Sequence, residues 1–252
     1  MNIKFLNGNG VKLLAAVLMV IDHIGMFFFP TLMWIRCIGR ISLPLFAYMI
    51  SEGCRYTKNK LKHISLLFGV ALACQLVYFF VGNSLQMSIL VTFTLSTLII
   101  YAMQYFKYCL LAEEKMSKVL LSAVLFIGMV FLTYALNCIT NIGGIPFSIE
   151  YGFWGCMLPV FASIFDFRGL PQCPLSKWDN HFVRQLCFAI GLFILCLTHY
   201  LFRDNVWQWF SLIALIPLAC YNGQKGKLNL KYFFYIFYPA HLALFYIIAY
   251  FI

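Results

Sequence analysis

The stretch between residues 11 and 29 reads VKLLAAVLMVIDHIGMFFF, and it decides the class of fold. Only Lys12, Asp22 and His23 interrupt its apolar side chains. A helix needs about 20 mostly apolar residues to cross the hydrocarbon core of a bilayer, and this run has that length. The stretch therefore predicts a membrane-spanning helix with Lys12 near its start and Asp22 and His23 in its second half.

The composition extends this interpretation to the whole chain. Of the 252 residues, 63% are hydrophobic and 10% are charged. A soluble domain has about 45–50% apolar and about 25% charged residues. A soluble enzyme, a secreted disulfide scaffold and a disordered chain are therefore excluded. The ten cysteines show neither a disulfide framework nor metal-ligand spacing, so no metal site is expected.

Eight further apolar runs follow along the chain. Their continuous rather than alternating character indicates helices, which satisfy the backbone in lipid, and not a β-barrel. The sequence therefore predicts an all-α polytopic membrane protein with about nine transmembrane helices in a single domain, residues 1–252. The eight runs lie at about 34–52, 64–82, 89–106, 119–136, 150–165, 185–202, 206–221 and 232–252.

The basic residues predict the orientation, because cytosolic loops carry an excess of Lys and Arg. With a cytosolic N-terminus, 15 of the 18 basic residues fall on the cytosolic side. Arg203 alone falls outside, and Arg36 and Arg40 lie within the second span. The C-terminus is then expected outside. The net charge of +10 thus reflects topology, and nucleic acid is not an expected partner.

Ionisable residues inside spans are costly and are candidates for function. His23 and Arg40 each lie about six residues from the outer end of a span, or about 9 Å below the outer interface. Only residues 30–33 join these two spans, so the spans are expected to be antiparallel neighbours. Asp22, His23 and Arg40 can then meet at one depth.

Helical spacing groups these residues by face. Lys12 and His23 are three turns apart and fall within about 20° of the same face at about 100° per residue. Arg36 and Arg40 share a face through their four-residue spacing. Pro44 disrupts the turn whose carbonyl belongs to Arg40, which predicts a kink beside the two arginines.

Each candidate has a structural alternative. Asp22 and Arg40 could form an ion pair that only fixes helix packing, and Arg36 could extend its charge to the interface. His241 in the last span is either a second functional histidine or a satisfied core residue. Glu52 could form a salt bridge with Arg55.

The cytosolic segment RYTKNKLK, residues 55–62, has two interpretations. It is either an ordinary positive-inside loop or an anion site. The anion site gains support because the same predicted helix connects this segment to Arg36 and Arg40.

Several segments together resemble the TraX family, which is named for the membrane acetylase of F-type pilin. The resemblance covers nearly the whole chain and is most specific in the first and last segments. It extends to the acyltransferase-3 set of transmembrane acyltransferases, although Lys12 stands where that pattern has Arg. The matching segments are KLL (12–14), IDHIG (21–25), GR (39–40), PLFA (44–47), SEG (51–53), RYT (55–57), YG (151–152) with Gly155, and FYIFYPAHL (234–242).

The resemblance implies an enzyme that uses acetyl-CoA or another acyl-CoA from the cytosolic side. His23 is the expected general base for direct transfer, with an acyl-histidine intermediate as the variant. Arg40 is expected to stabilise the oxyanion or to hold Asp22. Basic residues at the inner face are expected to bind the phosphates of CoA. The residues expected to bind substrate are Lys12, Arg36, Glu52, Arg55, Lys58, Lys60, Tyr238 and His241.

Two function classes remain open at this point. One is an acyl-CoA-dependent N- or O-acyltransferase in the lipid bilayer. The other is a proton-coupled transporter or channel that uses the intramembrane set Asp22, His23 and Arg40. For the enzyme, the sequence does not select between a pilin-like N-terminus, a glycan and a lipid as acceptor.

Overall fold

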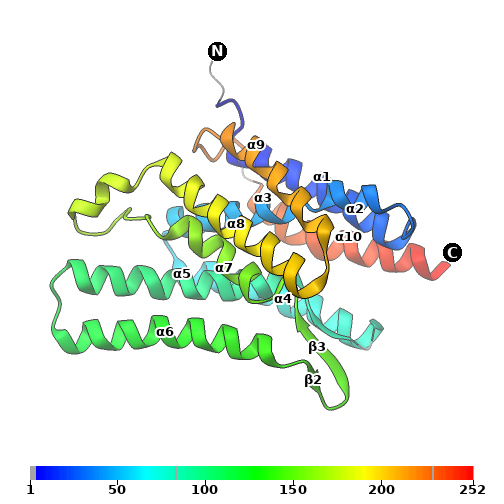
Figure 1. Ribbon diagram of the computed structural model, residues 1–252, viewed down its shortest axis with the longest axis horizontal. Coiled ribbons are helices and arrows are strands. Elements are labelled where there is room, and N and C mark those ends of the chain that lie inside the picture. The colour runs from blue at the N-terminus through cyan, green and yellow to red at the C-terminus, as the bar shows by residue number, and fades with distance from the viewer. Residues whose placement is uncertain (1–3, 83, 229, 252) are drawn as a thin grey trace. The chain divides into compact units, whose positions relative to one another are not determined.

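The computed structural model describes residues 4–82, 84–228 and 230–251, most of them in helices (Figure 1). The helices are α1 (Gly8–Phe27), α2 (Met33–Gly39), α3 (Ser42–Tyr56), α4 (Lys60–Gly82), α5 (Ile89–Leu111), α6 (Met116–Cys138), α7 (Gly152–Ser163), α8 (His181–Arg203), α9 (Leu215–Ala219) and α10 (Lys231–Phe251). Two 3-10 helices are η1 (Pro174–Trp178) and η2 (Val206–Ala214), and three strands are β1 (Leu85–Met87), β2 (Asn141–Ile142) and β3 (Ile145–Ile149).

Six helical segments of the described residues are long and apolar enough to cross a membrane, and they agree with six predicted spans. The three other predicted spans correspond to shorter apolar helices, 152–163, 206–219 and 232–245. Together these segments indicate a multi-pass membrane protein. The six long segments are Gly8–Phe27, Met33–Tyr56, Lys60–Phe80, Ile89–Leu111, Met116–Cys138 and His181–Arg203.

The second predicted span is divided in two, because the helix breaks at Arg40 and Ile41 between α2 and α3. Pro44 lies in the first turn of α3, where a proline is tolerated because that N–H has no helical partner. The predicted kink beside Arg40 is therefore confirmed. Ser42 donates a 2.7 Å hydrogen bond to the carbonyl oxygen of Ala15, which ties the start of α3 to α1.

Three short strands form a small sheet, so the expectation of an entirely α-helical chain was wrong in this detail. In the order β1-β3-β2, β1 runs parallel and β2 antiparallel to β3. Gly143 and Gly144 join β2 to β3 at φ 59° and 86°. Two successive positive φ angles are typical of a tight hairpin turn. The strands were not predicted because each has only two to five residues and lies in a segment between spans.

Contacts group the chain into two compact units. The first unit consists of the chain up to Met49 and from Leu192 onward, and the second is Ile50–Gly191. In the first unit, α1 packs against both α2 and α10. The helices α1 and α2 approach closely at Gly39, where an added Cβ would overlap Asp22. The expected single membrane domain stays a prediction.

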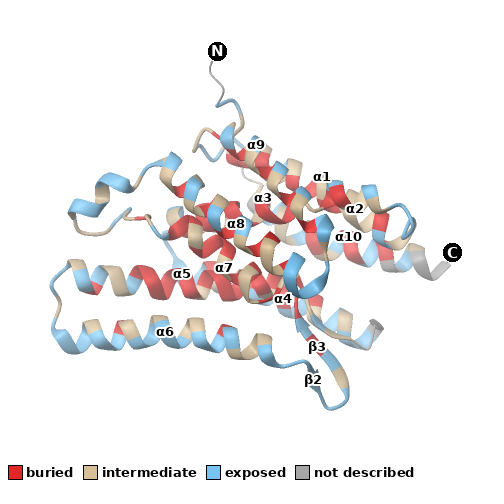
Figure 2. Ribbon diagram, in the orientation of Figure 1, coloured by how far each residue is buried: buried red, intermediate tan, exposed pale blue. Residues whose placement is uncertain are grey.

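The second unit is built around α5, which packs against α4, α6 and α7. Figure 2 shows α5 buried along much of its length, whereas α6 is exposed on most of its surface. Since α6 is also strongly apolar, its exposed face suits contact with lipid. The small sheet joins one set of helix ends, between α4 and α5 and between α6 and α7. The predicted cytosolic loops of this unit join the other ends.

The close approach at Gly39 gives a test of the α1–α2 packing. Gly39→Ala is expected to destabilise the protein by about 1–3 kcal/mol, because the added methyl group overlaps Asp22. Gly128→Ala in α6 is the control, since nothing lies within 4 Å of its added Cβ. Thermal unfolding of the purified protein in detergent measures both. Equal melting temperatures for the two variants would contradict the packing.

Candidate functional site

His23 and His241 face each other in the first unit. Their ring centroids are 4.9 Å apart and the ring planes meet at 82°. His23 comes from α1 and His241 from α10, and His241 is only 6% exposed. The structure therefore brings together two candidates that the sequence placed in its first and last spans.

Backbone hydrogen bonds fix the tautomer of both histidines. Nδ1 of His23 lies 2.8 Å from the carbonyl oxygen of Met19, and Nδ1 of His241 lies 2.8 Å from that of Phe237. A carbonyl oxygen can only accept, so Nδ1 carries the proton in each neutral ring. Nε2 then keeps a free lone pair, which is the form that a general base requires. Nε2 of His241 is buried and has no hydrogen-bond partner.

Aromatic rings surround the histidine pair. Phe245 stacks with His23 at 6.1 Å, and Phe237 stacks with His241 at 5.1 Å. The ring of Tyr238 meets His241 edge-on at 5.4 Å, so this predicted substrate residue does lie at the pair. The apolar rings reduce the access of water to the two imidazoles.

Lys12 occupies the same side of α1 as His23. Its Nζ lies 5.9 Å from the ring centroid of Phe234, so both residues face α10. The predicted shared face is confirmed. Lys12 contacts Phe234 and His23 contacts His241, so α1 and α10 run parallel. The predicted topology also has the first and the ninth span running in the same direction.

Asp22 and the two arginines lie where α1 meets α2. Asp22 packs against Gly39, the neighbour of Arg40, and Arg36 lies along α1 with Cγ 3.1 Å from a Cβ added at Gly25. Asp22 forms no ion pair within the described residues, and its Oδ1 is buried without a hydrogen-bond partner. The alternative of a structural Asp22–Arg40 ion pair is therefore not observed.

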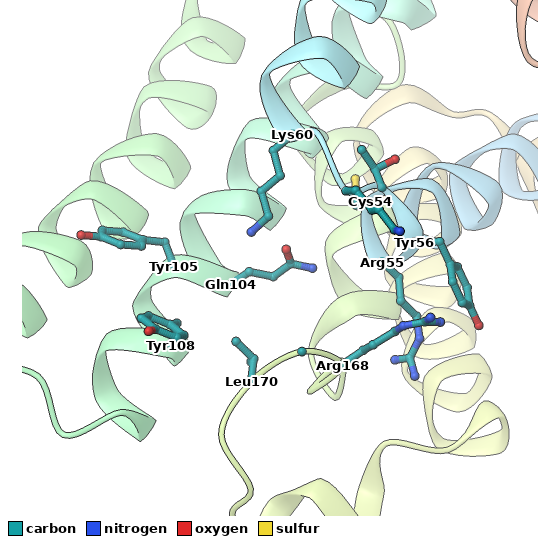
Figure 3. Close-up of a pocket in the computed structure, with 12 residues that line it drawn as sticks. Cys54, Arg55, Tyr56, Lys60, Gln104, Tyr105, Tyr108, Arg168 and Leu170 are labelled. Carbon is teal, nitrogen blue, oxygen red and sulfur yellow. The ribbon is translucent and has the colours of Figure 1, made fainter.

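A pocket of about 440 Å³ lies at the predicted cytosolic ends of helices in the second unit (Figure 3). The predicted cations Arg55, Lys58 and Lys60 all line it. They lie close together in the sequence, at the end of α3, between α3 and α4, and at the start of α4. Further lining residues were not singled out from the sequence. They are Cys54, Tyr56, Thr57, Gln104, Tyr105, Tyr108, Arg168, Gly169 and Leu170.

Two aspartates hold Arg55 at the wall of this pocket. Its Nη1 lies 2.6 Å from Oδ1 of Asp166 and 2.6 Å from Oδ1 of Asp179. The sequence offered one signal for them, since they are the two acidic residues in the otherwise basic segment 164–184. The predicted cation Arg55 is thus already compensated by carboxylates.

Glu52 is likewise paired inside the protein. Its Oε1 lies 2.6 Å from Nη2 of Arg184, and their side chains are only 7% and 4% exposed. The structural alternative of a salt bridge was therefore right for Glu52, but its partner is Arg184 and not Arg55. A role of Glu52 in substrate binding stays a prediction.

Comparison with known proteins bears on this geometry. The sequence model of a family described as TraX protein matches residues 7–249. The chain belongs to the TraX family. It is 24% identical over 247 residues to the "Probable fimbrial assembly protein FimC, serogroup H1" of Dichelobacter nodosus, covering 93% of this chain and 92% of the relative.

A shorter match to a second protein is closer in sequence. It is an uncharacterised protein of Rickettsia prowazekii (strain Madrid E), 40% identical over 62 residues, or 25% of this chain and 24% of the relative. No solved structure matches the chain. The first and last TraX-like segments, 12–25 and 234–242, carry the two histidines that meet in the first unit.

The Glu52–Arg184 pair of this TraX family member gives a stability test. Glu52→Gln is expected to destabilise the protein by about 3–5 kcal/mol, because it leaves the buried guanidinium without its counter-charge. Glu114→Gln is the matched control, since its pair with Lys118 is exposed and contributes little. Thermal unfolding in detergent compares them. A melting temperature of Glu52→Gln equal to that of Glu114→Gln would show that the pair is not structural.

Proposed function

We propose that this TraX family protein is an acyltransferase of the bacterial cytoplasmic membrane. It transfers an acyl group, acetyl in the simplest case, from acyl-CoA to an amine or hydroxyl at the outer side. The single observation that carries the proposal is the histidine pair of the first unit, with both Nδ1 atoms bonded to carbonyl oxygens. The proposal places the N-terminus in the cytosol and the C-terminus outside.

Acyl transfer requires a base, and His23 is the residue proposed for it. Its Nε2 takes the proton of the attacking amine or hydroxyl, whose nitrogen or oxygen forms a bond to the acyl carbon. The carbon–sulfur bond of the thioester breaks, and CoA leaves as a thiol that takes the proton back from the imidazolium. Arg40 is proposed to stabilise the oxyanion that forms on the acyl carbonyl.

The second histidine supports this assignment. Its ring meets the ring of His23 edge-on, and its buried Nε2 lacks a partner. A buried polar atom without a partner is rare in native structures and needs an explanation. We propose that His241, together with Tyr238, orients the acceptor or the acyl group beside His23.

The acceptor is proposed from the Dichelobacter nodosus protein, whose match covers 93% of this chain. That protein is described as a probable fimbrial assembly protein. An amine of a fimbrial subunit, such as a pilin-like N-terminus, is therefore the first acceptor to test. A glycan and a lipid head group are the two other classes.

Label transfer tests the role of His23. Membranes that contain the full chain are incubated with acetyl-CoA labelled in the acetyl group, and labelled protein, glycan and lipid are separated. His23→Gln is expected to lower the transferred label by about 100-fold or more, the usual size of a general-base effect. His181→Gln, at the start of α8 in the second unit, is expected to leave the transfer unchanged.

Two results would overturn the proposal. One is full transfer by His23→Gln at equal amounts of folded protein. The other is no transfer by the unmodified chain together with proton flux in reconstituted vesicles that depends on His23. That second result would assign the alternative function, a proton-coupled transporter or channel.

A further inference from the structure

The pocket of the second unit contains two kinds of cation. Arg55 is compensated, since Asp166 and Asp179 each place an oxygen 2.6 Å from its Nη1. Arg168 also lines the pocket and is exposed, and within the described residues it forms no ion pair. The positive charge that remains available to a ligand therefore belongs to Arg168, with Lys58 and Lys60, rather than to Arg55.

The same two aspartates hold the backbone of Arg168 in place. Oδ1 of Asp166 accepts the backbone N–H of Arg168 at 3.1 Å, and Oδ2 of Asp179 accepts that of Phe167 at 3.0 Å. Arg55 bonds to both carboxylates and thus closes a clamp around this turn. An arginine on a fixed backbone loses less freedom when it binds a ligand.

The guanidinium of Arg168 is also held by an aromatic ring. Its Cζ lies 4.1 Å from the ring centroid of Tyr56, which is a cation–π contact. The planar guanidinium presents several N–H donors in a fork that matches phosphate oxygens. A stacked arginine without a carboxylate partner is suited to bind an anion at its open edge.

The opposite side of the pocket is aromatic. Figure 3 shows Tyr108 of α5 on one side, Arg55 and Arg168 on the other, and Gln104 between them, whereas the ring of Tyr105 points away from Gln104. Tyr108 is 44% exposed, so its ring is accessible. Aromatic side chains stack readily on nucleobases. The volume of about 440 Å³ falls within the usual range for small-molecule sites.

We infer that this pocket binds the nucleotide end of the acyl donor, with Arg168 rather than Arg55 on its phosphates and Tyr108 against its adenine. The inference rests on the proposed function, because that function names CoA as the carrier. Arg55 is a positioning residue that acts through the two aspartates. A lipid head group offers the same phosphate chemistry, but it has no planar base to stack on Tyr108.

Binding of CoA to the full chain in detergent, measured by calorimetry, tests the inference. Arg168→Gln is expected to weaken CoA binding by about 10-fold or more, the effect of losing one charge-assisted contact to phosphate. Arg203→Gln removes the same charge from the end of α8, outside the pocket, and is expected to leave the affinity unchanged. ADP has an adenine and phosphates as CoA does, so it is expected to compete with CoA. Tyr108→Ala is expected to weaken the binding of ADP.

The outcomes separate this inference from the proposed function. His23→Gln is expected to bind CoA as the unmodified chain does while it loses transfer. Equal CoA affinity of Arg168→Gln and the unmodified chain would overturn the pocket assignment, even with transfer intact. Displacement of CoA by phosphatidylglycerol micelles but not by ADP would overturn it in favour of a lipid head group. If His23→Gln transfers the label fully and nucleotide still binds to the pocket, the proposed function alone is overturned.

Discussion

A charge that leaves water inside a protein must find a partner, and this requirement organises the second unit. Glu52 pairs with Arg184, and Arg55 is shared by two aspartates. Lys107 instead donates to three carbonyl oxygens at the C-terminal end of α7, at 2.6–3.3 Å. The last carbonyls of a helix lack N–H partners within it, so a lysine there satisfies the helix end and its own ammonium together. The carbonyl oxygen of Ser163 also accepts the backbone N–H of Asp166. The ends of α3, α5, α7 and α8 are joined in this way.

Some buried polar atoms do not meet this requirement. In the first unit, Nε2 of His241, Oδ1 of Asp22 and Nε of Arg36 are buried without hydrogen-bond partners. An unsatisfied buried polar group costs about 1–3 kcal/mol, which is a considerable fraction of the stability of a protein. These three atoms come from α10, α1 and α2. His23 lies in α1 as well, and Arg40 directly follows α2.

Local sequence patterns predicted what depends on neighbours along the chain. Run length predicted the spans, the eleven-residue spacing predicted the shared face of Lys12 and His23, and Pro44 predicted the break beside Arg40. Partners across the fold were not predictable, because nothing in a local pattern specifies them. Arg55 bonds to aspartates that lie 111 and 124 residues away in the sequence. Nothing in the segment around Arg55 therefore showed that its charge is already compensated and not free for a phosphate.

The two groups of residues differ in charge, and that difference follows from where each can exist. A neutral imidazole costs far less in lipid than a guanidinium, so two histidines with fixed tautomers suit chemistry within membrane spans. A cluster of cations is stable only at helix ends, where carboxylates and water compensate it. CoA has the same division, since its phosphates are charged and its acyl thioester is neutral. In the proposed reaction, the reacting thioester is thus the part of the donor that costs least in the hydrocarbon region.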